Sequence, residues 1–239
     1  MPVVTITGLV GSGAPEIGAQ VARQLECDYV DRQVLAEAAR KIGTTMDVVT
    51  ELTERLPSLG DRIGTFFRRV LERSAIAGTE GGPYFGAGAG ALLVREYREL
   101  TDAVIEGSED VSDAYLLEVT QSVITDLAQS GHTVIIGRGS NTILKDWPGT
   151  LHVGLHASLE SRVKRVITRE RLDQAAAERY VSDMDHGYVA YFHRFFHTEI
   201  HEPLSYHLQL NTDWVDDATA AGLIVTSAKN LDSATAATS

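Results

Sequence analysis

A glycine-rich turn joins a strand pattern to a helical pattern at the start of the chain. Residues 3–7 read Val-Val-Thr-Ile-Thr, a β-branched run typical of a short strand buried on both faces. Three glycines follow within positions 8–13, and apolar residues then recur at helical spacing up to Leu25, with Pro15 in the first turn. A strand that passes through a glycine turn into a helix begins a βαβ unit, so this feature favours an α/β fold with a parallel sheet.

The same alternation continues along the chain. Further strand patterns lie at 28–31, 133–137, 151–155 and 207–210. Helical patterns lie at 32–41, 111–130, 158–169, 172–194 and 216–228. Together with residues 3–7, these patterns predict a three-layer α/β fold of the P-loop type, with five parallel strands and helices on both faces of the sheet.

Composition narrows the classes of function. The chain of 239 residues carries 33 acidic and 21 basic side chains, for a formal net charge of −12. A strongly acidic chain is not expected to bind long nucleic acids or anionic membrane surfaces. Its single cysteine, Cys27, cannot form an intramolecular disulfide, and no basic leader or long apolar run is present. We therefore expect a cytoplasmic protein without a membrane helix.

The glycine turn has the spacing of a phosphate-binding loop. Gly8-x4-Gly13 would point backbone N–H groups at an anion bound at the helix N-terminus. The next two positions, where such loops carry Lys for the phosphates and Ser or Thr for Mg²⁺, are Ala14 and Pro15. Glu16 would repel one phosphate charge by about 3 kcal/mol at roughly 5 Å and an effective dielectric of about 20. A structural turn that binds nothing is the alternative.

Five motifs in this order resemble the bacterial cytidylate kinases and their cytidylate kinase-like relatives. They are Gly8–Gly13, Tyr29–Asp31, Val134–Asn141, Leu155–Arg165 and Pro203–Thr212. The resemblance covers roughly residues 3–43 and 116–227. It implies a P-loop nucleoside-monophosphate kinase fold, with ATP and Mg²⁺ as cofactors and nucleoside mono- and triphosphates as partners.

The resemblance also implies a domain plan. A single kinase-like domain would cover 1–230, with its core at 1–43 and 111–230. A helical insertion at 44–110 would correspond to the monophosphate-binding region, and a lid-like region would cover 169–202. Residues 231–239, rich in Ala, Ser and Thr, would form a disordered tail. The stretch 62–76 within the insertion could pair with a second copy of the chain or cover its own core.

Site residues follow from the same resemblance. It implies that Gly8, Gly11, Ser12 and Gly13 contact the triphosphate, that Asp31 lies near the base or ribose of the acceptor nucleotide, and that Arg138 binds the acceptor's phosphate. Arg138 directly follows a buried strand, at the edge where open α/β sheets bind ligands. The alternatives are a salt bridge for Arg138 and a helix N-cap for Asp31. After the arginine such kinases usually have an acidic residue, whereas this chain has Gly139.

A basic cluster precedes the lid-like region. Its members are Arg162, Lys164, Arg165, Arg169 and Arg171. Mobile arginines of this kind can clamp the transferring phosphoryl group, and a solvated helix face is the alternative. Within 183–194 only Arg194 remains of the arginines that a kinase lid carries. The candidate catalytic residues are therefore Arg138, Arg162 and Arg194.

Two histidines four residues apart offer a different interpretation of the lid. His193 and His197 would share one helix face and could hold a metal ion. Because aromatic residues surround them in the sequence, an aromatic packing face is the alternative. We expect no metal site.

Two classes of function remain. The first is a nucleoside-monophosphate kinase that transfers a phosphoryl group from ATP to CMP or dCMP. The second is a nucleotide-binding regulator, a pseudokinase that keeps the fold and has weak or no catalysis, which Ala14 and Pro15 favour.

Overall fold

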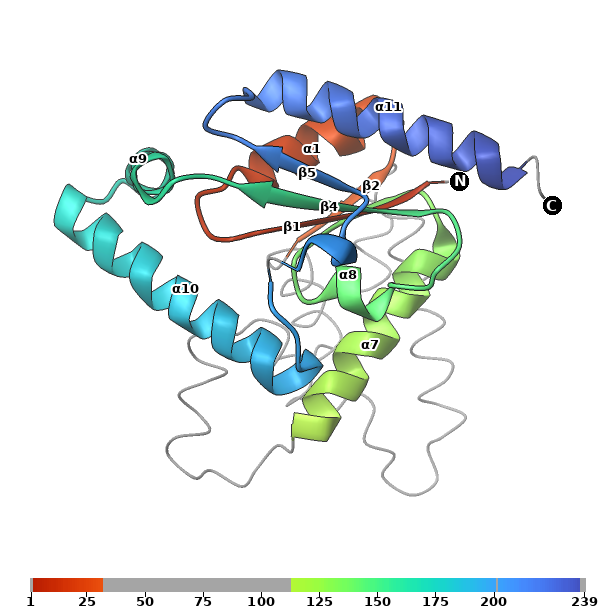
Figure 1. Ribbon diagram of the computed structural model, residues 1–239, viewed down its shortest axis with the longest axis horizontal. Coiled ribbons are helices and arrows are strands. Elements are labelled where there is room, and N and C mark those ends of the chain that lie inside the picture. The colour runs from red at the N-terminus through yellow and green to blue at the C-terminus, as the bar shows by residue number, and fades with distance from the viewer. Residues whose placement is uncertain (1, 32–112, 201, 237–239) are drawn as a thin grey trace, which may run out of the picture.

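The computed structural model describes residues 2–31, 113–200 and 202–236. The predicted helix at 32–41, the insertion at 44–110 and the stretch at 62–76 lie outside the described residues. Figure 1 shows the described part as a twisted sheet between two groups of helices.

Five parallel strands form one sheet in the order β2-β3-β1-β4-β5. The strands are β1 (Val3–Gly8), β2 (Asp28–Val30), β3 (Thr133–Ile136), β4 (Thr150–His156) and β5 (Leu208–Asn211). Each predicted strand is confirmed, with its ends within one residue of the expected positions. The α/β fold with a five-stranded parallel sheet is therefore the one that the sequence predicts.

Helices cover both faces of this sheet. They are α1 (Ala14–Leu25), α7 (Asp113–Ser130), α8 (Ser140–Ile143), α9 (Leu159–Glu170), α10 (Gln174–Phe196) and α11 (Asp217–Ala236), with a short 3-10 helix η2 (Pro203–Ser205). Figure 1 shows α1 and α11 on one face and α7 and α8 on the other, with α9 beyond the arrowheads of the strands. Among the described residues, no helix is long and apolar enough to cross a lipid bilayer.

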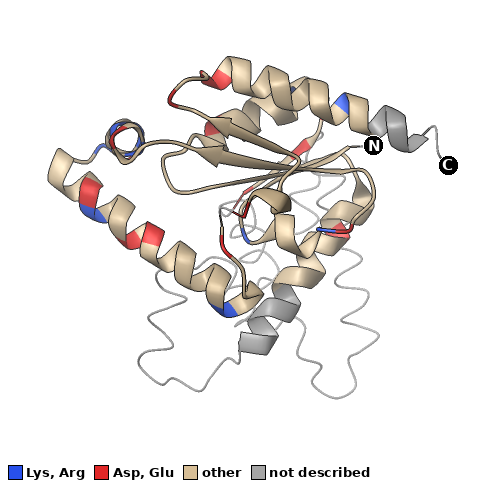
Figure 2. Cartoon of the chain, in the orientation of Figure 1, with Lys and Arg blue, Asp and Glu red and all other residues tan. Residues whose placement is uncertain are grey.

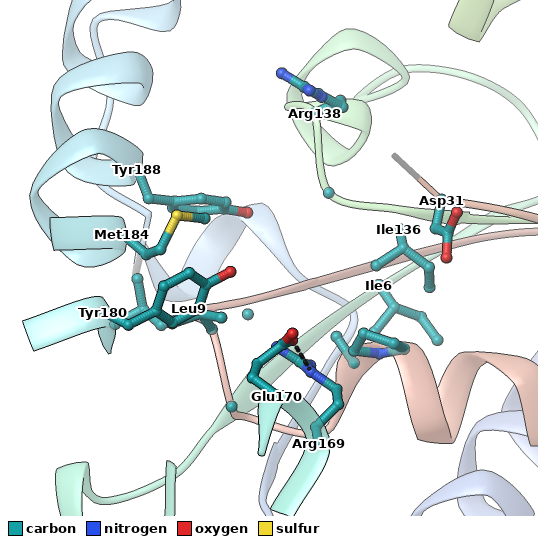
Figure 3. A pocket seen from close by; sticks show the side chains of 16 residues that line it. Ile6, Leu9, Asp31, Ile136, Arg138, Arg169, Glu170, Tyr180, Met184 and Tyr188 are labelled. Carbon is teal, nitrogen blue, oxygen red and sulfur yellow. Dashed lines mark hydrogen bonds and ion pairs between the residues drawn. The ribbon is translucent and has the colours of Figure 1, made fainter. Parts of the chain in front are cut away.

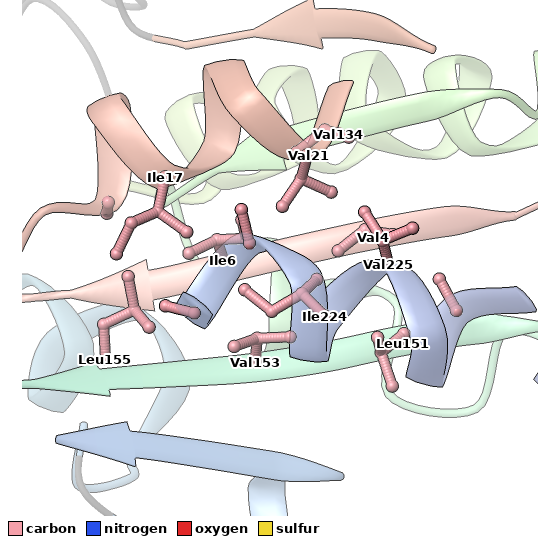
Figure 4. Packing of buried hydrophobic residues seen from close by; sticks show 14 of the residues in the cluster. Val4, Ile6, Ile17, Val21, Val134, Leu151, Val153, Leu155, Ile224 and Val225 are labelled. Carbon is pink, nitrogen blue, oxygen red and sulfur yellow. The ribbon is translucent and has the colours of Figure 1, made fainter. Parts of the chain in front are cut away.

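The main core lies between the sheet and the pair α1 and α11. Alternate residues of β4, namely Leu151, Val153 and Leu155, point toward this pair and are at most 4% exposed. Ile17 of α1 and Ile224 of α11 are completely buried against them (Figure 4). Because β1, β3 and β4 are buried on both faces, they read in the sequence as nearly continuous apolar runs.

Helix α11 is longer than the sequence pattern indicates. The apolar spacing ends the helix at 228, whereas the observed helix continues to Ala236. The tail that the sequence predicts to be disordered from 231 begins within this helix, and residues 237–239 lie outside the described residues. This segment offers little to bury, but alanine has the highest helix propensity and extends a helix that is already nucleated.

A pair of histidines between β4 and β5 was not foreseen. His152 is 3% exposed, and its Nδ1 lies 2.8 Å from the Thr5 hydroxyl. Its ring stacks on His207 at 5.0 Å between centroids, and the backbone N–H of His152 donates to Nδ1 of His207 at 2.9 Å. Burial, and then the neighbouring His207, lower the pKa of His152 to about 4.

This pKa predicts a loss of stability in acid. Between about pH 6.5 and 4 the unfolded chain binds a proton that the folded protein does not, so the free energy of unfolding falls as the pH falls through this window. From pH 7 to pH 5 the loss should be about 2 kcal/mol. Urea unfolding at both pH values should show this loss in the wild type and in the exposed control His186→Gln, and should not show it in His152→Gln. Equal losses in all three proteins would contradict the assignment.

Candidate functional site

The predicted phosphate loop links β1 to α1 and packs against the backbone of α9. Gly11 has a left-handed backbone, with φ at +83°. A Cβ atom at this position would lie 2.5 Å from the carbonyl oxygen of Arg162. Only glycine fits here, because the left-handed conformation and the close approach each exclude a side chain. The loop therefore has one fixed position relative to α9.

The last strand holds the loop from another direction. The hydroxyl of Thr212, which follows β5, lies 2.9 Å from the carbonyl oxygen of Ser12 and 3.2 Å from that of His156. Thr212 and Ser12 are both buried. A second bond inside the loop runs from the Ser12 N–H to the Leu9 carbonyl at 3.0 Å. The loop is thus held in place by the protein itself, before any ligand binds.

A cleft of about 480 Å³ opens beside the loop, over the carboxyl ends of β1, β2 and β3. Figure 3 shows Arg138 and Asp31 on one side of it, Tyr180, Met184 and Tyr188 on another, and Arg169 with Glu170 below. Of the predicted site residues, Gly8, Gly11, Asp31 and Arg138 line this cleft. Ser12 and Gly13 belong to the loop without lining the cleft.

Arg138 occupies an unusual backbone position. It is 3% exposed and has φ at +57°, between Gly137 at +70° and Gly139 at +71°. A non-glycine residue in this region carries about 1–2 kcal/mol of strain, and such strain is concentrated at functional sites. The ring of Phe196 occupies the space that a side chain at position 139 would need. The absence of a side chain at Gly139 is therefore a packing requirement of α10.

Arg162 is not presented to the cleft. Its two terminal nitrogens each donate to one carboxylate oxygen of Asp185 at 2.8 Å, so the two residues form a bidentate pair between α9 and α10. The side chains are 8% and 23% exposed. Arg162 also donates to the Val10 carbonyl of the loop at 3.4 Å. The structure thus places this predicted catalytic residue as a link between the loop, α9 and α10.

The other arginines of α9 that face the loop are also paired with carboxylates. Arg165 makes a bidentate pair with Asp217 at 2.7 and 3.0 Å, and hydrogen bonding to that carboxylate raises the pKa of Arg165. Arg169 lies 3.7 Å from Glu16 and 2.8 Å from Glu170. Figure 2 shows acidic positions on α10 and at the start of α11, and Asp185 and Asp217 on these helices pair with Arg162 and Arg165 of α9. The face of α9 that carries these arginines is therefore packed against the loop and not merely solvated.

The lid candidates lie elsewhere. Arg194 lies 5.8 Å from the centroid of the Phe195 ring, outside the lining of the cleft. His193 pairs with Glu199 at 3.1 Å, and His197 is an exposed cap at the end of α10. Within the described part of the chain, no three His, Cys, Asp or Glu side chains are grouped as metal ligands would be. Tyr188, Tyr191, Phe192 and Phe195 of α10 form an apolar cluster with Ile200, so the aromatic packing face is present.

Sequence reasoning missed one wall of the cleft. Tyr180, Met184 and Tyr188 line it from α10, and their spacing of four residues was visible in the sequence.

Behind the opposite wall, Tyr29 donates a hydrogen bond to Asp31. Burial, followed by the charge of Asp31, raises the pKa of the Tyr29 phenol above its usual range. The phenol stays protonated and orients the Asp31 carboxylate at the edge of the cleft.

Comparison with known proteins agrees with this architecture. The chain belongs to the cytidylate kinase-like family, whose pattern it matches over residues 3–214. A crystal structure of an uncharacterized protein from Eubacterium ventriosum is similar at TM-score 0.54 and 15% identity, covering 96% of this chain and 99% of that one. This likeness extends to the fold alone. The fold is therefore that of the P-loop kinases.

Weaker likenesses add nothing to the family assignment. A shikimate kinase from Acinetobacter baumannii in complex with shikimate aligns at TM-score 0.44 and 12% identity, over 95% of this chain and 92% of that one. A gluconokinase from Sinorhizobium meliloti aligns at TM-score 0.43 and 12% identity, over 96% and 95%. No curated protein matches the sequence.

The contact between Thr212 and the loop predicts a specific loss of stability. Thr212→Val keeps the shape and leaves the buried carbonyl of Ser12 without its donor, which should lower the free energy of unfolding by about 1–2 kcal/mol. Thr212→Ser keeps the hydroxyl and should recover most of this loss. Thr226→Val removes an exposed hydroxyl on α11 and should have no effect. If the valine variants at 212 and 226 unfold alike in urea, the contact does not hold the loop.

The Arg162–Asp185 pair predicts a larger effect. Asp185→Asn leaves a nearly buried guanidinium without its counter-charge and should lower the free energy of unfolding by about 3 kcal/mol. The matched control is Lys164→Gln, which breaks the exposed pair with Glu160 on the same helix and should leave stability unchanged. Chemical denaturation of the two variants provides the comparison. An Asp185→Asn protein as stable as the wild type would show that the pair carries no stability.

Proposed function

We propose that the cleft binds a nucleoside triphosphate on the glycine loop and a nucleoside monophosphate against Arg138, and that a phosphoryl group passes between them. ATP is the proposed donor, and CMP or dCMP is the proposed acceptor. Family membership supports a nucleotide kinase-like protein. The observation that carries the finer proposal is Arg138, a buried guanidinium held in a strained backbone across the cleft from the loop.

In this reaction an oxygen of the acceptor's phosphate attacks the γ-phosphorus of ATP. The bond from that phosphorus to the β–γ bridging oxygen breaks, and ADP leaves with the electron pair. The protein contributes mainly by positioning and by stabilising charge. The planar fork of Arg138 can hold two acceptor oxygens at once, while the N–H groups of the loop face the donor phosphates.

The residues beside the loop fit Mg²⁺ poorly. Pro15 stands where a hydroxyl ligand would be and offers no oxygen donor. Among the described residues, the side-chain carboxylates that line the cleft are those of Asp31 and Glu170, and the second is hydrogen-bonded to Arg169. Mg²⁺ that enters with ATP would thus be held by the phosphates and by water, as this ion prefers.

A second candidate function is nucleotide binding with little or no transfer. The specific observation in its favour is the loss of both reactive side chains of the loop, at Ala14 and Pro15. Both candidates predict binding of nucleotides, and they differ in turnover. We expect slow turnover with ATP and CMP, below about 1 s⁻¹, the lower end of the usual range for enzymes.

Binding and turnover together test the proposal. Calorimetry with ATP and CMP separately should show one binding site for each nucleotide. Arg138→Gly and Arg138→Lys should weaken the affinity for CMP by about tenfold or more and leave the affinity for ATP unchanged. Glycine suits the left-handed backbone at 138, and lysine keeps the charge without the fork. Arg23→Ala, an exposed change on α1, should alter neither affinity.

Three results would contradict parts of this proposal. Wild-type protein that binds neither nucleotide would overturn it. Binding of CMP that does not depend on Arg138 would remove the assigned acceptor site. A coupled assay that detects no ADP release with CMP, dCMP or other monophosphates, despite binding, would select the regulator over the kinase.

A further inference from the structure

A carboxylate and an arginine lie together where the phosphate loop lacks its lysine. Glu16 is in the first turn of α1, directly after Ala14 and Pro15. Its Oε1 lies 3.7 Å from Nη1 of Arg169, and its Oε2 is buried without a hydrogen-bond partner among the described residues. Arg169 itself lines the cleft next to these loop residues.

This ion pair is weaker than its neighbours on the same helix face. Arg162 and Arg165 each make two hydrogen bonds to one carboxylate, at 2.7 to 3.0 Å. The contact between Arg169 and Glu16 exceeds hydrogen-bond distance, and the side chains are 30% and 37% exposed. A phosphate could offer Arg169 short, charge-assisted bonds that Glu16 does not provide. Arg169 also donates its Nε to the exposed carboxylate of Glu170 at 2.8 Å, so its Nη1, which faces Glu16 beyond hydrogen-bond distance, is the group that an incoming anion can take over.

The charges around the cleft show why a phosphate that replaces Glu16 beside Arg169 would bind more tightly. Its described lining contains two cationic residues, Arg138 and Arg169, from opposite sides. Arg138 follows β3, away from the loop, so of these two lining cations Arg169 is the one on the loop side of the cleft. While Glu16 and Glu170 neutralise Arg169, this cation offers little net positive charge to an anion at the loop.

We propose that Glu16 is an internal competitor for the nucleotide's phosphates: it holds Arg169 in the empty cleft, and a bound triphosphate takes Arg169 over as the cation that the loop lacks. This inference rests on the proposed function, because it assumes that a triphosphate binds at the loop. It adds a regulating contact to that site. Affinity is then set by the exchange of one anion for another on Arg169.

The test uses the full chain and inorganic triphosphate as the probe, in EDTA and by calorimetry. Glu16→Gln should strengthen binding by about fivefold, and Arg169→Ala should weaken it by about tenfold. In the Arg169→Ala background, Glu16→Gln should give little or no gain, because Glu16 acts through Arg169. The matched controls on the exposed side of α10, Glu178→Gln and Arg179→Ala, should bind like the wild type. Thermal unfolding of each variant separates a change in binding from a loss of fold.

Each alternative result has a distinct meaning. If the wild type binds triphosphate and no variant differs from it, this inference fails and the proposed function stands. If the wild type does not bind triphosphate, both fail. An equal gain from Glu16→Gln with and without Arg169 would overturn the competitor role in favour of direct repulsion. A gain in EDTA that becomes a loss in Mg²⁺ would identify Glu16 as a metal ligand and would also overturn it.

Discussion

The close approach of Gly11 to the carbonyl of Arg162 sets the geometry of the whole site. Because there is no room for a side chain, α9 lies directly on the phosphate loop. Arginines at 162, 165 and 169 recur at helical spacing and so share the face of α9 that this contact turns toward the loop. The first of them binds the lid-like helix, the second binds the start of α11, and the third borders the cleft. One backbone contact therefore fixes where each of the three arginines lies relative to the loop.

Charge in this protein is balanced locally at the site and not over the chain as a whole. The sequence has an excess of acidic residues, yet its basic helix lies directly against the glycine loop. The structure shows carboxylates on three different elements facing these arginines, at Glu16, Asp185 and Asp217. A cluster of positive charge in a sequence thus predicts an anion site only when its internal partners are known.

The sheet could be predicted from sequence because each strand is a local signal. Buried strands are short, continuous apolar runs, and parallel strands place their carboxyl ends at one edge. For this reason Gly8, Asp31 and Arg138 could be expected to meet before any contact was known. The pairings that tune the site could not be predicted. Arg162 and Asp185 form an ion pair only because α9 and α10 pack against each other. The need for glycine at position 139 follows only from the packing of Phe196 against it.

The bond between Thr212 and Ser12 has a consequence for synthesis of the protein. These residues lie 200 positions apart, with the loop at the start of the chain and its support directly after the last strand. A nascent chain therefore contains every glycine of the loop long before the loop can take its final shape. Only when β5 has left the ribosome and joined the edge of the sheet does the carbonyl of Ser12 gain its partner. The order of synthesis therefore makes the loop one of the first segments to be translated and one of the last to reach its final shape.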